Sequence, residues 1–158
     1  MTLPSSATYL LARLAGVHIA LPASSVKELV RAVALATVPG APRILEGAMN
    51  LHGAIIPVLD LRVPLGLPAR TNDPADTLII LETGARRLAV RVESVDDVEE
   101  IASSSIHAPD AMSPTMATLS GLAGIATRDD GAVIIYDPAA FLSQAEGDAI
   151  DAALAAHG

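Results

Sequence analysis

Carboxylates and histidines are the side chains of this sequence that could do chemistry. Carboxylates gather in one short stretch, where they could form an acid/base pair or a cation site: Asp96, Asp97, Glu99 and Glu100. Acidic side chains on a strand are far more often solvated than catalytic, so we expect a solvated strand face there. The histidines, at positions 18, 52, 107 and 157, have no partner at the spacing of metal ligands. We therefore predict no metal site.

Other catalytic and cofactor signatures are missing from the sequence. It contains neither a phosphate-binding Gly-x-x-x-x-Gly-Lys-Ser/Thr loop nor a Gly-x-Ser-x-Gly nucleophile turn. Residues 121–124 lack the acidic residue that follows a dinucleotide-binding turn, and residues 103–105 are better explained as a polar turn. The absence of cysteine excludes disulfides, thiolate metal ligands and cysteine nucleophiles. We expect no enzyme and no cofactor.

Composition narrows the class of partner. The formal net charge is −8, which argues against nucleic acid because phosphate binding depends on clustered Lys and Arg. Aromatic residues make up only 2% of the chain, too few for platforms on which bases or sugars stack. No apolar run approaches the length of about 20 residues that crosses a bilayer, and residues 1–8 do not resemble a signal peptide. We expect a cytoplasmic protein without membrane insertion.

The distribution of Gly and Pro, which interrupt helices and strands, predicts a mainly β fold. Eleven Gly and eleven Pro are spread over 158 residues, so the apolar runs between them are short. Residues 8–21 read as a hairpin, residues 26–30 as a further strand and residues 147–157 as a short C-terminal helix. We expect one domain, residues 1–158, made of two small SH3-like five-stranded β-barrels side by side.

An approximate internal repeat supports two similar subdomains. The stretch at Ser94 lies 69 positions after the one at Ser25, and Gly121 lies 74 positions after Gly47. Residues 131–137 follow residues 53–60 by 77 to 78 positions, so the offset grows through loops. We interpret residues 8–70 and 76–142 as the repeat halves, joined at residues 72–75. The alternative is that short hairpins resemble one another by chance.

The most distinctive stretch is residues 50–62, a turn followed by an apolar run that ends in Asp-Leu-Arg. This pattern predicts a buried strand whose polar side chains lie at its two ends. Asp60 and Arg62 would project from the same side of an extended chain, which suits a local ion pair or a partner contact equally well.

The order of these segments resembles the bacterial chemotaxis coupling proteins of the CheW family. The segments that carry the resemblance are residues 9–14, 19–21, 26–29, 37–42, 45–47, 50–62, 88–95 and 124–142. The motif at residues 50–62 is the most specific, through Asn50, Gly53, Pro57, Asp60 and Arg62. The resemblance implies a non-catalytic adaptor that couples the cytoplasmic tip of methyl-accepting chemoreceptors to the regulatory domain of the histidine kinase CheA. It also implies recruitment to membrane-associated receptor arrays.

The resemblance also implies where the partners bind. A receptor-binding groove between the barrels would include Val26, Glu28, Leu29, Gly47, Asn50, His52, Val90 and Val92. The kinase would contact the loop from Pro109 to Leu119. His52 stands where the family usually has Arg, so its anchor to Glu28 should be weaker and should fade as rising pH removes the imidazole charge. A role for His52 in satisfying a backbone group at a turn is an equal alternative.

Two alternatives to chemotaxis coupling remain open from the sequence. Within the adaptor class, the chain could serve a pilus-based or other non-flagellar array. Outside that class, the acidic stretch and the serine-rich turns could belong to a small enzyme or a ligand-binding barrel.

Overall fold

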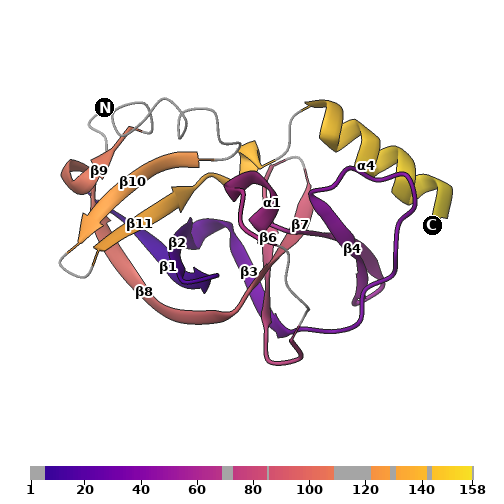
Figure 1. Cartoon of the computed structure of the whole chain (residues 1–158), viewed down its shortest axis with the longest axis horizontal. Helices are drawn as coiled ribbons and strands as arrows, with labels where there is room; N and C mark the ends of the chain where they lie inside the picture. Colours follow the sequence, from indigo (N-terminus) through magenta and orange to yellow (C-terminus); the bar gives the residue numbers. More distant parts are fainter. Residues whose placement is uncertain are drawn as a thin grey trace.

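The computed structural model describes residues 6–68, 73–84, 86–108, 122–128, 131–141 and 144–157. Strands dominate, and one longer helix lies at the C-terminal end (Figure 1). The strands are β1 (Ser6–Leu14), β2 (Val17–Pro22), β3 (Val26–Arg31), β4 (Leu45–Leu51), β5 (Ala54–Leu59), β6 (Thr77–Glu82), β7 (Arg87–Val92), β8 (Ser94–Ala102), β9 (Ile106–His107), β10 (Leu122–Arg128) and β11 (Gly131–Tyr136). The helices are α1 (Arg62–Leu65) and α4 (Gln144–His157), with 3-10 turns at Ala23–Ser25, Ser103–Ser105 and Pro138–Ala140.

The strands form two sheets, which build two SH3-like subdomains. One sheet has the order β8-β1-β2-β11-β10-β9, and the other has the order β3-β6-β7-β5-β4. The predicted mainly β fold is therefore confirmed. The first sheet has a sixth strand because residues 106–107 pair with β10, whereas the corresponding contact in the other sheet is a single bridge between Ala36 and Ala48.

The subdomains are not the two halves of the sequence. The first sheet joins β1 and β2 to β8, β9, β10 and β11, and the second joins β3, β4 and β5 to β6 and β7. Each half thus lends its first hairpin to the other half's sheet, and residues 72–75 are not a boundary between subdomains. A period of two identifies strands but not their partners, because pairing depends on which faces are buried together in the fold.

The repeat is nevertheless visible in the topology. The orders β8-β1-β2-β11-β10 and β3-β6-β7-β5-β4 match strand for strand. Both β3 and β8 have a register shift next to a valine, Val26 in one and Val95 in the other, 69 positions apart. Asp60 and Asp137 follow β5 and β11, and each carboxylate accepts a hydrogen bond from the N–H two residues further on, at 3.0 Å. These matching details are evidence for a duplicated unit.

The structure corrects one assignment within the repeat. Gly47 in β4 corresponds to Gly124 in β10, because each follows a register shift in an equivalent strand. The predicted counterpart, Gly121, lies outside the described residues. The offset is a constant 77 positions in this region instead of growing from 74, so the extra residues precede β10.

The largest core cluster draws on both sheets and on α4. It contains Leu14 and Ile19 from one sheet, Ile79 and Val90 from the other, and Ile150 from the helix. Smaller clusters lie within each sheet. Because the largest cluster of buried residues is shared, we expect the two subdomains to fold as one cooperative unit.

Helix α4 begins three residues before the predicted start at residue 147. Ile150 enters the shared core, and Asp151 accepts two hydrogen bonds from Arg86, at 2.9 and 3.1 Å. Among the described residues, no helix is both long and apolar enough to cross a membrane.

Candidate partner-binding groove

Strand β3 is an edge strand of its sheet, because it pairs only with β6. Its side chains alternate between half-buried and exposed, as expected for a strand with one face on the core. Val26 packs against the shared core, whereas Leu29 is 45% exposed. A large apolar side chain on an unpaired edge is a feature of surfaces that bind other proteins.

The turn between β4 and β5 brings His52 close to Glu28, as we predicted. His52 and Gly53 both have positive φ, 52° and 86°, which matches the two-residue turn that joins antiparallel strands. Gly53 donates its N–H to Asn50 Oδ1 at 3.0 Å, so the asparagine closes the turn. His52 Nε2 lies 3.4 Å from Glu28 Oε1 across the gap to β3. The predicted proximity of His52 and Glu28 is therefore present in the fold, at an exposed site.

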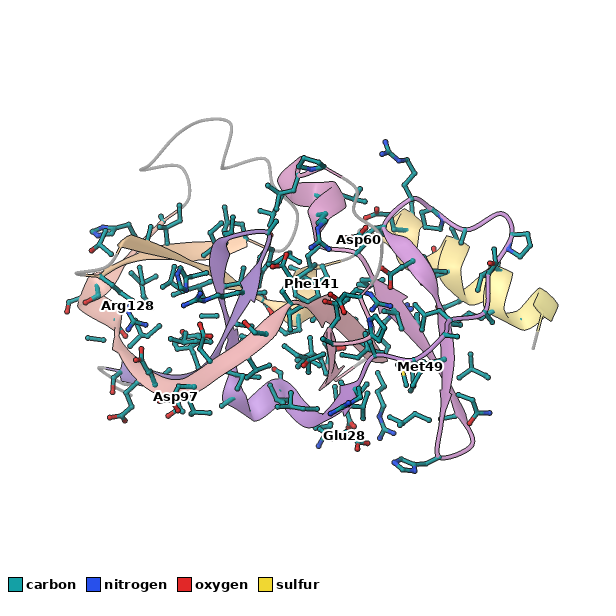
Figure 2. The ribbon with its side chains drawn as sticks, turned by 60° about the horizontal axis from the view of Figure 1, so that its bottom comes forward. Glu28, Met49, Asp60, Asp97, Arg128 and Phe141 are labelled. Atoms are coloured by element: carbon teal, nitrogen blue, oxygen red, sulfur yellow. The ribbon has the colours of Figure 1, made fainter. Side chains whose placement is uncertain are left out.

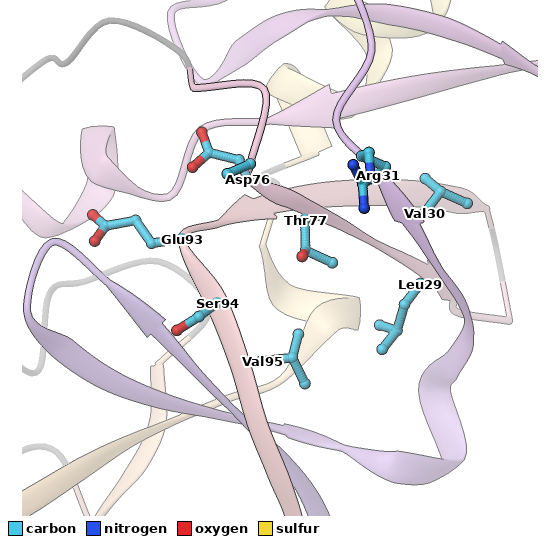
Figure 3. A pocket seen from close by; sticks show the side chains of 9 residues that line it. Leu29, Val30, Arg31, Asp76, Thr77, Glu93, Ser94 and Val95 are labelled. Atoms are coloured by element: carbon cyan, nitrogen blue, oxygen red, sulfur yellow. The ribbon is translucent and has the colours of Figure 1, made fainter.

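An open groove of about 450 Å³ lies where β3 faces the start of β8. Figure 3 shows Leu29 on β3 and Val95 on β8 directed toward the space between the two strands, with Thr77 above them in this view. The groove is lined by Leu29, Val30, Arg31, Ala75, Asp76, Thr77, Glu93, Ser94 and Val95. Its lining is mixed: apolar side chains come from both strands, and Arg31, Asp76 and Glu93 add charges of both signs.

Several residues that we predicted for the receptor-binding groove do not line it. Val90 and Val92 are 0% exposed and belong to the shared core, so the prediction that they line a groove is wrong. Gly47 is also buried, and a Cβ there would lie 2.8 Å from Leu35 Cβ. It contributes close backbone packing instead of a binding surface. The error at Val90 and Val92 arises because β7 is buried on both faces from Leu88 to Val92.

Sequence reasoning missed the second wall of the groove. Val95, Ser94 and Glu93 come from the β7–β8 junction, and Thr77 comes from the start of β6. The internal repeat contained a usable signal, because Val95 lies 69 positions after Val26 and occupies the equivalent place in β8. Arg31 and Thr77 had no such signal.

The remaining motif residues have structural roles. Pro57 lies opposite Ala48, whose N–H and C=O are bonded to Ala36 at 3.0 and 2.9 Å, so the position needs no N–H from residue 57. Asp60 accepts the N–H of Arg62, the first residue of α1. Arg62 is buried and donates to Glu93 Oε1 at 2.9 Å. Asp60 therefore bonds the backbone of Arg62, and the ion pair that the Arg62 side chain makes is with Glu93, not the predicted local one.

Burial affects one carboxylate near the groove. Desolvation raises the pKa of Glu46 above its ordinary value of 4.5, although the hydrogen bonds from Arg91 oppose this effect. Arg91 itself is 3% exposed and also contacts Asp76 Oδ2 at 3.4 Å. Arg91 and Asp76 are thus almost fully buried, although Asp76 lines the groove.

The acidic stretch lies on β8 as a largely solvated strand face, as predicted. Asp96 pairs with Arg13 at 3.3 Å, and Glu99 receives two hydrogen bonds from Arg128. Figure 2 shows Asp97 and Glu28 along the same side of the molecule. No group of three or more potential metal ligands occurs among the residues that the structure describes. The predicted kinase-contact residues Pro109 and Leu119 lie outside those residues.

Comparisons with known proteins agree on one family. The model of the CheW-like domain matches residues 8–146. The chemotaxis protein CheW of Klebsiella aerogenes is 30% identical over 118 residues, which cover 73% of this chain and 69% of that protein. The chemotaxis protein CheW of Rhizobium meliloti is 28% identical over 69 residues, which cover 44% of each chain.

A solved structure is similar over most of the fold. The scaffolding protein TtCheW from Thermoanaerobacter tengcongensis superposes with a TM-score of 0.72 at 31% identity, over 83% of this chain and 88% of that chain. The family match, the sequence relatives and the two-subdomain fold thus agree. The chain belongs to the CheW-like domain family and is a non-catalytic scaffold or adaptor of chemotaxis signalling.

Proposed function

We propose that the groove between β3 and β8 binds the cytoplasmic tip of a methyl-accepting chemoreceptor, and that another surface binds the regulatory domain of a CheA-type histidine kinase. The chain then couples receptor to kinase inside the cytoplasm, at membrane-associated arrays. The observation that carries this proposal is the open groove between two edge strands, with Leu29 45% exposed on one wall.

The chemistry of the groove suits a helical segment with an apolar stripe. Leu29 and Val95 offer apolar contacts from opposite walls, and Arg31 offers a charge at the rim. A protein interface commonly combines an apolar centre with a polar rim in this way. The exposed pair of His52, in the β4–β5 turn, and Glu28, on β3 next to Leu29, would meet a partner that extends beyond the groove.

Binding of a purified receptor tip fragment tests the groove. We expect Leu29→Asp to weaken this binding at least tenfold while the unfolding transition is retained, because a carboxylate would replace the main apolar contact. Val33→Asp is the matched control, since Val33 is 49% exposed and does not line the groove. Equal loss of affinity in both variants would contradict the assignment of the groove.

The kinase contact is a separate part of the proposal. The family resemblance suggests end-to-end pairing between a barrel of this chain and the CheW-like regulatory domain of the kinase, with residues 109–119 as the contact loop. Substituting that loop with glycine and serine should abolish co-elution with the regulatory domain and leave receptor binding intact. Retained co-elution would move the kinase contact elsewhere.

The pathway served by the array is the finest level of the proposal. We favour flagellar chemotaxis, and a pilus-based or other array is the alternative. Deleting the gene in its own bacterium and scoring swimming against surface motility separates the two, with the Leu29→Asp variant as the non-complementing control. A defect only in surface motility would favour the alternative.

A further inference from the structure

An ion pair beside the groove joins three parts of the chain. Arg62, at the start of α1, donates to Glu93 Oε1 at 2.9 Å. The same oxygen accepts the N–H of Ala15, in the β1–β2 turn, at 2.7 Å, and the N–H of Glu93 is bonded to Arg13 O at 2.9 Å. Glu93 lies between β7 and β8, where the chain passes from one sheet to the other. These contacts hold the start of β8, one wall of the groove.

A second buried cluster holds the other wall. Arg91 on β7 donates from Nε to both carboxylate oxygens of Glu46 on β4, at 3.1 and 2.9 Å. Its Nη1 lies 3.4 Å from Oδ2 of Asp76, just before β6. The backbone oxygen of Asp76 accepts the N–H of Ala32 at 3.0 Å, immediately after β3. The end of β3 is thus connected through Asp76 to Arg91.

The two clusters meet at the groove itself. Asp76 and Glu93 both line it, Asp76 beside the end of β3 and Glu93 at the start of β8 (Figure 3). Arg91 and Asp76 are each 3% exposed, so their contact is largely shielded from water and salt, whereas Arg62 is 4% exposed but pairs with a Glu93 side chain that is 36% exposed. The distance between the walls therefore depends on directional contacts made by two buried arginines.

The equivalent positions in the other subdomain form no such network. The positions that correspond through the offsets of 69 and 77 are occupied by uncharged residues: Ala7, Pro22, Ser24, Ala123 and Ala139. The same topology therefore closes there without buried charges. Stability of the duplicated fold alone does not explain why five charged residues gather on the groove side.

We propose that Arg62, Arg91, Glu93, Glu46 and Asp76 are positioning residues that set the spacing between β3 and β8 and thereby the affinity of the groove for its partner. The inference rests on the proposed receptor-binding function. A buried ion pair defines geometry more sharply than an apolar contact, because its hydrogen bonds are short and directional. None of these residues needs to touch the partner through its charge.

Interspin distance measurements test the spacing directly. The chain has no native cysteine, so Lys27→Cys on β3 and Glu100→Cys on β8 place one nitroxide label on each wall strand. We expect Glu93→Ala in this background to broaden or shift the distance distribution and to weaken binding of the receptor tip fragment at least tenfold. Arg86→Gln is the matched control, because it removes the bidentate pair with Asp151 far from the groove.

Several outcomes decide the proposal. An unchanged distribution in folded Glu93→Ala, or an equal change in Arg86→Gln, overturns it. Arg62→Lys keeps a charge that reaches Glu93 and should restore the distribution more fully than Arg62→Met, which a general loss of stability does not predict. If Glu93→Ala does not fold, Glu93→Gln replaces it, and an unchanged distribution there also overturns the proposal.

The same experiment separates this inference from the proposed function. The distances are measured without any partner. If they change in Glu93→Ala while the parent protein does not bind the receptor fragment, the receptor assignment fails and the spacing role stands. If the parent binds and the distances do not change, the reverse holds.

Discussion

The two subdomains share a strand order but differ in the contacts that hold their strands together. In the subdomain built on β3, β6, β7, β5 and β4, Arg91 is buried against two carboxylates. Its counterpart in the other subdomain is Pro22 on β2. Apolar packing and backbone pairing are therefore enough to close the fold once, and the charged version adds directional contacts beside the groove. The difference indicates that a duplicated unit can keep its topology while one copy acquires a specific local geometry.

The edge strands sharpen the same comparison. Leu29 on β3 and Val98 on β8 occupy equivalent places, 69 positions apart, and are 45% and 51% exposed. Only Leu29 lines the groove described above. Equivalent positions in a repeat thus share exposure without sharing surroundings.

The largest expected effect is at Arg91. We expect Arg91→Met to lower the free energy of unfolding by about 3–5 kcal/mol, because Glu46 and Asp76 would lose the cation between them in a buried setting. Urea unfolding measures this effect. Arg13→Met is the control, since its pair with Asp96 is exposed and should be worth less than about 1 kcal/mol. Equal losses of unfolding free energy in the two variants would contradict the idea that burial strengthens the Arg91 contacts.

The equivalent glycines should behave alike. Gly47→Ala would place a Cβ 2.9 Å from the Ala36 oxygen, and Gly124→Ala would place one 3.0 Å from the His107 oxygen. We expect each to lower the free energy of unfolding by about 1–3 kcal/mol, because a rigid backbone must shift. Gly84→Ala meets nothing within 4 Å and should be nearly neutral. A large effect at only one of the two crowded glycines would break the equivalence.

Removing the hydroxyl of Tyr136 should stabilise the protein. Its hydroxyl is buried without a hydrogen-bond partner, and the equivalent position in β5 is Leu59, which has no polar atom. Burial also raises the pKa of Tyr136. We expect Tyr136→Phe to raise the free energy of unfolding by about 1 kcal/mol, because it removes an unsatisfied polar group and keeps the edge-to-face contact with Phe141. A clear loss of stability would point to a role for the hydroxyl.

We expect Glu46 to make the free energy of unfolding depend on pH, which its uncharged counterpart Ala123 cannot do. Burial raises the pKa of Glu46 above 4.5, so the folded protein holds this proton more tightly than the unfolded chain. The stabilisation from the protonated form is full below 4.5 and is lost as pH rises through the folded pKa. The unfolding free energy of the wild type should therefore fall relative to that of Glu46→Gln as pH rises. A constant difference between the two proteins across this range would contradict the prediction.

The smallest effect is expected at His52. His52→Arg would keep a charge opposite Glu28 at every physiological pH, whereas the imidazole pairs as a cation only when protonated. We expect tighter receptor binding by less than about 1 kcal/mol, because the pair is exposed, with weaker dependence on pH. Titration calorimetry at pH 6 and pH 8 measures both. Identical affinities and pH responses would leave His52 as a turn residue.

Much of the fold was predictable because it depends on local patterns. Short apolar runs, with Gly and Pro between them, predicted the strands, and the positive φ of His52 and Gly53 agrees with a predicted turn before β5. The motif at residues 50–62 predicted the family, and the family model covers residues 8–146. Of the residues predicted for the receptor groove, Leu29 lines the groove between β3 and β8, whereas Val90 and Val92 are buried because β7 is covered on both faces; receptor binding by Leu29 stays a prediction.

The sequence by itself determined the strands, the repeat and the absence of cysteine chemistry, since each follows from residue type and spacing. Only the tertiary structure decided which strands pair, because each half's hairpin joins the other half's sheet. It also decided that Arg62 and Glu93, 31 positions apart, meet beside the groove. Contacts of this kind depend on long-range burial and on the path of the chain between sheets, and neither leaves a periodic signal in the sequence.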